Sequence, residues 1–157
     1  AGVVMLIASF MAFYRLPFPG GAVTADLIAE SARAVGADVV SSMAAGRDAE
    51  SIAAALGDGA YDLLLTVGGS GVGRTDAAVT ALAARGEVFA HGIALQPGRT
   101  SAVGRVGKTP VVVLPGAPDQ ALAAWCTLAL PVLDRLSRRR PREIAKPGDT
   151  RQIIERV

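Results

Sequence analysis

The sequence predicts an α/β fold of three layers, a mostly parallel β-sheet covered by helices on both faces. The segments Val3–Ile7 and Asp62–Val67 are apolar almost throughout instead of alternating with polar residues. Strands of this kind are buried on both faces, which is typical of parallel sheets. Segments with helical spacing separate them, and this alternation of strands and helices favours a sheet between two helical layers.

The size and composition of the chain indicate a single folded domain. Of its 157 residues 51% are hydrophobic, and its net charge is only +2, which together exclude a disordered protein. No apolar run reaches the roughly 18 to 20 residues that span a bilayer, so no membrane partner is expected. The small arginine excess does not indicate nucleic-acid binding. The single cysteine, Cys126, excludes a disulfide framework and fits the cytoplasm, where we expect the protein; its side chain is expected to be buried.

The first half of the chain alternates strands and helices. After the strand Val3–Ile7, a helix is expected from an N-cap at Thr24 or Asp26 to about Ala34, with Gly36 ending it. The elements expected next are a strand at Asp38–Ser42, a short helix capped by Asp48 and ending at Gly57, and the strand Asp62–Val67.

The second half begins with the glycine cluster Gly68–Gly73 and ends in a long helix. That helix follows the turn Pro115–Pro118, and Pro131 is expected to kink it. Its expected inward stripe is Leu122, Trp125, Ala129, Val132, Leu133 and Leu136. Between the glycine cluster and the long helix we expect a helix at Asp76–Arg85, a strand at Glu87–Leu95 and a turn at Gln96–Gly98. A hairpin of Ala102–Val106 with Pro110–Leu114 is expected to follow.

Residues 1–137 are expected to form the domain. The last twenty residues, 138–157, are polar and poorly patterned, so we expect a linker towards a further module. The chain also begins within an apolar strand, which indicates a domain taken from a longer protein.

The glycine cluster is the main candidate for a binding site, since ligands of such sheets bind beyond the carboxyl ends of the strands. Four glycines in the six residues 68–73 allow a tight turn with exposed N–H groups, which suits a phosphate. Ser70 and Thr75 add hydroxyl groups. Asp76 either bridges to the phosphate through Mg²⁺ or caps the next helix, and both roles are compatible.

The loop departs from the common phosphate-binding motifs. No Gly-Lys-Ser/Thr sequence follows it, so it is not a Walker loop. Gly69 and Gly71 have the first spacing of a dinucleotide fingerprint, but Arg74 replaces its third glycine. Neither Ser70 nor Ser101 lies in the Gly-x-Ser-x-Gly elbow of a hydrolytic nucleophile.

A second turn, Pro115–Pro118, also precedes a helix, and two helix N-termini at one crevice favour a ligand with several negative charges. Arg74 and Arg99 lie in the candidate loops and are expected to add positive charge there. The only histidine, His91, is more often a packing or hydrogen-bonding residue than a catalyst.

Three motifs carry a family resemblance. They are Gly68–Asp76 (GGSGVGRTD), His91–Arg99 (HGIALQPGR) and Leu114–Pro118 (LPGAP). In this order and spacing they resemble the molybdopterin-binding domain of molybdenum-cofactor biosynthesis proteins. The resemblance runs from about Val3 to Leu136, and the second motif is most similar to the molybdenumtransferase branch.

The resemblance implies a domain that binds molybdopterin, or its adenylylated form, and supports the insertion of molybdate with Mg²⁺. It implies that Asp76 is the catalytic and Mg²⁺-assisting acid, and that the protein is a homo-oligomer. The residues implied to bind the cofactor are Gly68, Gly69, Ser70, Gly71, Gly73, Arg74, Thr75, Arg99, Pro115, Gly116 and Pro118.

Several positions depart from the family pattern. The usual Thr-Gly-Asp-Glu after the first strand is replaced by the acid-free segment Ala8–Ala12, and the usual lysines of the second motif are Gln96 and Arg99. Arg99 still binds oxyanions, whereas Gln96 carries no charge. Ala117 replaces an asparagine. Two alternatives therefore stand beside the molybdenumtransferase: a non-catalytic molybdopterin-binding module, and a molybdopterin adenylyltransferase.

Overall fold

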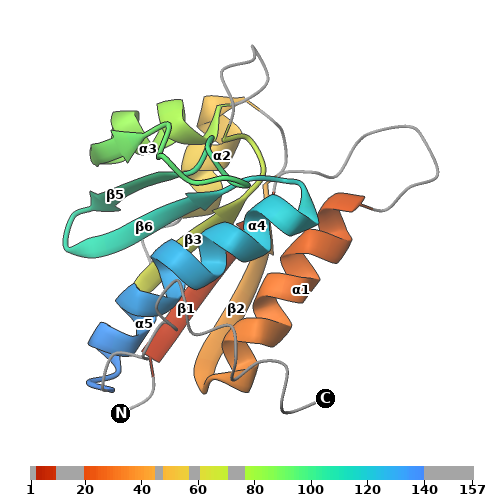
Figure 1. The fold of residues 1–157 in the computed structure, drawn as a ribbon. Coiled ribbons are helices and arrows are strands. Elements are labelled where there is room, and N and C mark those ends of the chain that lie inside the picture. The colour runs from red at the N-terminus through yellow and green to blue at the C-terminus, as the bar shows by residue number, and fades with distance from the viewer. Residues whose placement is uncertain (1–2, 10–19, 45–47, 57–60, 71–76, 140–157) are drawn as a thin grey trace.

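The computed structural model describes residues 3–9, 20–44, 48–56, 61–70 and 77–139. These residues form one six-stranded sheet with helices on both of its faces (Figure 1). The predicted three-layer α/β fold is confirmed. No helix in these ranges is long and apolar enough to cross a membrane.

The sheet has the strand order β2-β1-β3-β6-β5-β4. Parallel pairing joins β2, β1, β3 and β6, whereas β5 and β4 add an antiparallel edge. The strands are β1 (Val3–Ser9), β2 (Ala37–Met43), β3 (Leu63–Val67), β4 (Glu87–His91), β5 (Ala102–Val106) and β6 (Thr109–Leu114).

Helices cover the sheet in two layers, with α1, α4 and α5 on one face and α2 and α3 on the other (Figure 1). A π-helical turn, Trp125–Ala129, connects α4 to α5. The helices are α1 (Gly20–Ala34), α2 (Ala49–Leu56), α3 (Ala78–Arg85), α4 (Pro118–Ala124) and α5 (Leu130–Leu136).

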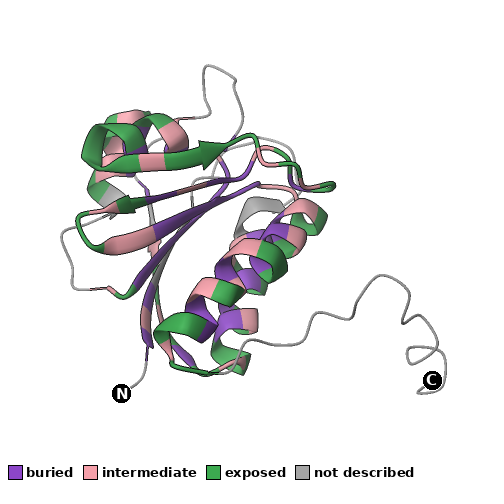
Figure 2. Cartoon of the chain, turned by 60° about the vertical axis from the view of Figure 1, so that its left-hand side comes forward, coloured by how far each residue is buried: buried purple, intermediate pink, exposed green. Residues whose placement is uncertain are grey.

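The continuous apolar strands are explained by two cores, one on each face of the sheet. Along β3, Leu63, Leu65 and Val67 pack into the core beneath α1 and α4, whereas Leu64 packs into the core beneath α2 and α3. Successive side chains of a strand point to opposite faces, so both sets of positions must be apolar. Figure 2 shows the buried residues concentrated on the central strands and the inner sides of the helices.

The first helix begins earlier than predicted. α1 starts at Gly20, so neither Thr24 nor Asp26 is its N-cap. Thr24 is fully buried instead, and its hydroxyl donates to the carbonyl oxygen of Gly116 at 2.9 Å. A side chain that is favoured at caps thus serves a tertiary contact here. The predicted cap of α2 is confirmed, because the Ser51 N–H donates to a carboxylate oxygen of Asp48 at 2.8 Å.

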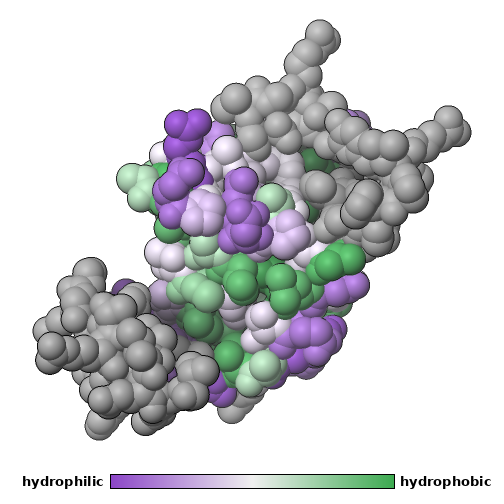
Figure 3. Space-filling view, turned by 45° about the vertical axis from the view of Figure 1, so that its right-hand side comes forward, coloured by the Kyte–Doolittle hydropathy of each residue, from purple (hydrophilic) through white to green (hydrophobic). Residues whose placement is uncertain are grey.

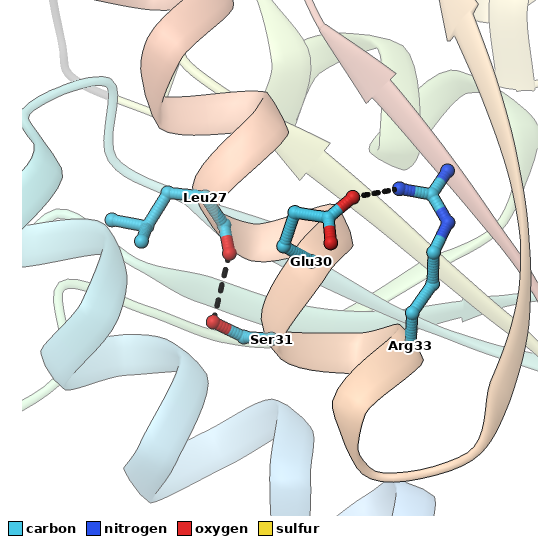
Figure 4. A network of polar contacts seen from close by, with 4 residues as sticks. All are labelled: Leu27, Glu30, Ser31 and Arg33. Carbon is cyan, nitrogen blue, oxygen red and sulfur yellow. Dashed lines mark hydrogen bonds and ion pairs between the residues drawn. The ribbon is translucent and has the colours of Figure 1, made fainter.

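The exposed side of α1 carries local polar contacts. The Ser31 hydroxyl donates to the carbonyl oxygen of Leu27 at 2.7 Å, and Arg33 pairs with Glu30 at 2.8 Å (Figure 4). Exposed ion pairs of this kind contribute only about 0 to 1 kcal/mol, so α1 depends mainly on the burial of its inner face. Hydrophobic surface also remains on this side of the molecule (Figure 3), and Val23 is 51% exposed.

The C-terminal helix is interrupted at the expected place, but by a π turn. The Leu130 N–H donates to the carbonyl of Trp125, five residues back, immediately before Pro131. Proline lacks an N–H and crowds the preceding turn, and the wider π turn accommodates it.

The predicted inward stripe is confirmed in its middle and wrong at both ends. Trp125, Ala129 and Leu133 are buried, whereas Leu122 and Leu136 are 40% and 39% exposed. In α4 the buried positions are Ala121 and Ala124, so the inward face is one residue away from the predicted one. Cys126, predicted to be buried, is exposed as well.

The strand predicted at Glu87–Leu95 is shorter than expected. β4 ends at His91, because Gly92 adopts a φ of +76° and turns the chain out of the sheet. The hairpin formed by β5 and β6 around Gly107 is confirmed.

Candidate functional site

The candidate site lies at the edge of the sheet where β3 and β6 end. The neighbouring parallel strands β1 and β3 are followed by α1 and α3, which lie on opposite faces of the sheet. Loops that diverge in this way leave a crevice at the carboxyl ends of the strands, the usual place for a ligand in such folds. Gly68, Gly69 and Ser70 follow β3 directly at this point.

The first two glycines anchor the loop to its surroundings. Gly68 has a φ of +93° and Gly69 a φ of +64°, values that favour glycine. The Gly68 N–H donates to the Leu114 carbonyl at 2.9 Å, and the Gly69 carbonyl accepts from the Ala78 N–H at 3.0 Å. The N–H groups of Gly68 and Ala78 are therefore already donated within the protein.

Ser70 connects the first motif to the second. It is only 4% exposed, and its hydroxyl lies 3.0 Å from the Thr100 hydroxyl. Its carbonyl oxygen lies 2.9 Å from Nε2 of His91, at the end of β4. Both the side chain and the main chain of Ser70 are thus bonded to the segment His91–Thr100.

The second motif folds back on itself and packs on α4. The carbonyl of Gly98 accepts from the Ser101 N–H at 3.0 Å and from the Ser101 hydroxyl at 2.7 Å. Gly98 has a φ of +113°, which favours glycine, and a Cβ there would also lie only 3.2 Å from the Gln120 carbonyl oxygen. The Gln96-Pro97 peptide bond in this turn is cis. Arg99 is exposed.

The third motif forms the turn from β6 into α4. Pro115 is buried, and the Gly116 carbonyl accepts from the hydroxyl of Thr24 on α1. Pro118 lies in the first turn of α4, as predicted. Ala117, which precedes the helix, provides no side-chain cap.

The fold brings the three motifs together. Gly68 bonds to Leu114, Ser70 bonds to His91 and Thr100, and Gly98 lies against Gln120 of α4. The remaining predicted site residues, Gly71, Gly73, Arg74, Thr75 and Asp76, lie outside the described residues, as does the predicted linker beyond Arg139.

Sequence reasoning missed the structural roles of three threonines near this edge. Thr24 and Thr100 make the contacts described above, and Thr66 in β3 is 1% exposed with a hydroxyl that has no hydrogen-bond partner among the described residues. Thr100 directly follows the second motif, and its position beside Arg99 was the one available signal. Thr24 and Thr66 lie within apolar segments, which carry no sequence signal for these roles.

The described residues do not form a Mg²⁺ site by themselves. Within the described ranges, no group of three or more His, Cys, Asp or Glu side chains gathers to hold a metal. Hydroxyl and carbonyl groups predominate at the edge, and Mg²⁺ sites in proteins normally include at least one carboxylate. The role of Asp76 with Mg²⁺ therefore stays a prediction.

Comparison with known proteins supports the motif analysis. Residues 22–135 match a family model described as a probable molybdopterin binding domain. Over 116 residues the chain is 36% identical to molybdopterin molybdenumtransferase 2 of Mycobacterium tuberculosis, covering 68% of this chain. The chain spans only 28% of the length of that relative.

Two solved structures have the same fold. The molybdopterin biosynthesis moea protein from Pyrococcus horikosii is similar with a TM-score of 0.66 and 25% identity, over 88% of this chain and 36% of that one. The molybdopterin biosynthesis Mog protein from Mycobacterium ulcerans has a TM-score of 0.67 and 24% identity, over 88% of this chain and 99% of its own. The chain therefore belongs to the probable molybdopterin binding domain family of molybdenum-cofactor biosynthesis proteins.

Proposed function

We propose that this domain binds molybdopterin, or its adenylylated form, at the sheet edge formed by the three motifs, and supports the insertion of molybdate. The observation that supports this most is the convergence of the motifs: Gly68 bonds to Leu114 of the third motif, and Ser70 contacts His91 of the second motif and Thr100. The 36% identity to a molybdenumtransferase favours this reaction over adenylylation.

The ligand's phosphate is proposed to meet Arg99. The N–H groups of Gly68 and Ala78 are already donated within the protein, so neither of them is available to the phosphate. Arg99 is exposed and follows the constrained Gly98 turn. A guanidinium binds phosphate with two parallel hydrogen bonds, so Arg99 orients the phosphate as well as neutralising it.

Calorimetry with anaerobically prepared molybdopterin tests this binding. Arg99→Ala should weaken binding by about tenfold or more, as expected for the loss of a charge-assisted hydrogen bond. Arg105→Ala is the matched control, because Arg105 pairs with Glu87 at the opposite end of β4 and β5. Equal affinities of the two variants would contradict the role of Arg99.

An insertion assay separates the molybdenumtransferase from the alternatives. With adenylylated molybdopterin, molybdate and Mg²⁺, the protein should form molybdenum cofactor, and Asp76→Asn should abolish this while leaving the fold intact. Binding without insertion would instead favour a non-catalytic module. Gln96, Ala117 and the acid-free segment Ala8–Ala12 are the departures from the family pattern that suggest this alternative. ATP-dependent adenylylation would identify an adenylyltransferase.

Homo-oligomerisation also stays a prediction, which analytical ultracentrifugation tests.

A further inference from the structure

Ser70 is held at two points by residues outside the glycine cluster. The ring of His91 reaches its carbonyl oxygen at 2.9 Å, and the hydroxyl of Thr100 reaches its hydroxyl at 3.0 Å. The two partners come from the end of β4 and from the turn before β5, so the contacts span 21 and 30 residues of sequence. Neither contact belongs to the regular hydrogen bonding of the sheet.

The donor can be assigned for one of the two hydrogen bonds, the bond between His91 and Ser70. A carbonyl oxygen only accepts, so Nε2 of His91 must carry the hydrogen. The neutral Nε2–H tautomer and the imidazolium both satisfy this requirement. Because a peptide group is planar, a hydrogen bond to the Ser70 carbonyl fixes the whole peptide group, and the bond to Thr100 fixes the side chain.

We propose that His91 and Thr100 are positioning residues for the molybdopterin site, and this rests on the function proposed above. They hold Ser70 so that the chain leaving Gly68 and Gly69 keeps its ligand-binding conformation. Glycines give a loop many alternative conformations, and the loop loses this conformational entropy when a ligand fixes one of them. Fixing the loop in advance removes part of that entropy loss, so affinity rises without any new contact to the ligand.

The location of His91 separates this role from ordinary packing. His91 is exposed at the end of the edge strand, and it belongs to neither hydrophobic core. Removing its ring leaves both cores intact, so global stability should change little. Ser70 should lose its contact with His91 and keep its contact with Thr100, and the effect should appear in ligand affinity and in the local dynamics at Gly69 and Ser70.

Substitutions at His91 provide the test, with a built-in rescue. In His91→Leu the donor is lost, whereas in His91→Gln an amide N–H occupies a position close to that of Nε2. We expect His91→Leu to weaken molybdopterin binding by about fivefold, His91→Gln to recover most of the affinity, and both to retain the wild-type melting temperature. Equal affinity of His91→Leu and wild type would overturn the proposal.

The Thr100 contact is tested by a double-mutant cycle. Ser70→Ala and Thr100→Val each remove one hydroxyl, and the double variant removes both. If the hydroxyls act through each other, the double variant should bind molybdopterin about as weakly as either single variant. Fully additive losses would show that each acts separately, and would overturn the role of Thr100.

A measurement on the ligand-free protein separates this proposal from the proposed function. The Ala78 amide donates to the Gly69 carbonyl, so its hydrogen exchange reports on how firmly the loop is held. In His91→Leu this exchange should accelerate several-fold, and in His91→Gln it should not. Accelerated exchange in a protein whose wild type binds no molybdopterin would refute the function but retain the loop-positioning role. Unchanged exchange in His91→Leu would refute the positioning role itself.

Discussion

At the scale of single residues, Thr66 is the least expected feature of the core. It lies in β3 on the same face as Leu64, under α2 and α3, because alternate residues of a strand share a face. Its hydroxyl is buried, and no residue in the described part of the chain forms a hydrogen bond with it. An unsatisfied buried polar group costs about 1 to 3 kcal/mol. Thr66 thus reduces stability beside the candidate site.

Replacing Thr66 with valine should therefore stabilise the protein. Thr66→Val has nearly the same shape and should raise the free energy of unfolding by about 1 kcal/mol, measured by urea denaturation. Thr109→Val is the matched control, because the Thr109 hydroxyl donates to the Tyr61 carbonyl at 2.9 Å. That variant should lose about 1 kcal/mol. A lower stability of Thr66→Val would show that its hydroxyl is satisfied.

Asp48 makes the stability of α2 dependent on pH. The backbone N–H and the hydroxyl of Ser51 bond to its carboxylate and hold the pKa of Asp48 below its usual 3.8. The folded state therefore favours the charged form. The resulting stability is complete above pH 3.8 and is lost as the pH falls through the lower folded-state pKa.

Comparing Asp48→Asn with the wild type at two pH values checks this effect. Asparagine is an equally good cap without a titrating group. The difference in melting temperature between wild type and Asp48→Asn should shift in favour of the variant as the pH falls from 7 towards 2. A pH-independent difference would rule out this contribution of the Asp48 carboxylate.

At the scale of elements, glycines determine how closely the antiparallel edge packs. A Cβ on Gly104 in β5 would lie only 2.2 Å from the Glu87 carbonyl oxygen and 3.0 Å from the Leu82 side chain. No side chain can be accommodated there without moving β4 or α3.

Gly104→Ala should consequently be strongly destabilising. We expect a loss of about 3 kcal/mol in the free energy of unfolding, because backbone atoms must shift. Gly107→Ala in the neighbouring turn is the control: its Cβ would meet open space, and only its φ of +58° is unfavourable. That change should cost about 1 kcal/mol. Similar losses in both variants, measured by urea denaturation, would contradict a steric origin.

The predictability of the elements differs along the chain for physical reasons. The buried strands were predictable because both of their faces are apolar, and the cap of α2 because Asp48 acts locally. The start of α1 was not predictable, because Thr24, which looked like a cap, instead contacts Gly116, 92 residues away. The outward position of Leu122 was missed because two small residues, Ala121 and Ala124, form the buried face of α4 in place of the larger leucine.

At the scale of the whole molecule, the topology assembles a site from segments that are distant in sequence. The parallel pairing of β3 with β6, and the antiparallel pairing of β5 with β6, bring the three motifs to one edge. Their order in the sequence indicated the family, and the fold agrees with it. The contacts of Ser70 with His91 and Thr100 were not predictable, because they depend on this tertiary arrangement.

The most direct test of the central claim is a titration of the ¹⁵N-labelled protein with molybdopterin, followed by NMR under anaerobic conditions. Amide signals of Ser70, His91, Arg99, Thr100 and Gly116 should shift in a saturable manner. Signals of Glu87, Arg105 and Gly107, at the opposite end of β4 and β5, should remain in place. Absence of any shift, or shifts confined to the opposite end, would contradict a molybdopterin site at the edge where the three motifs meet.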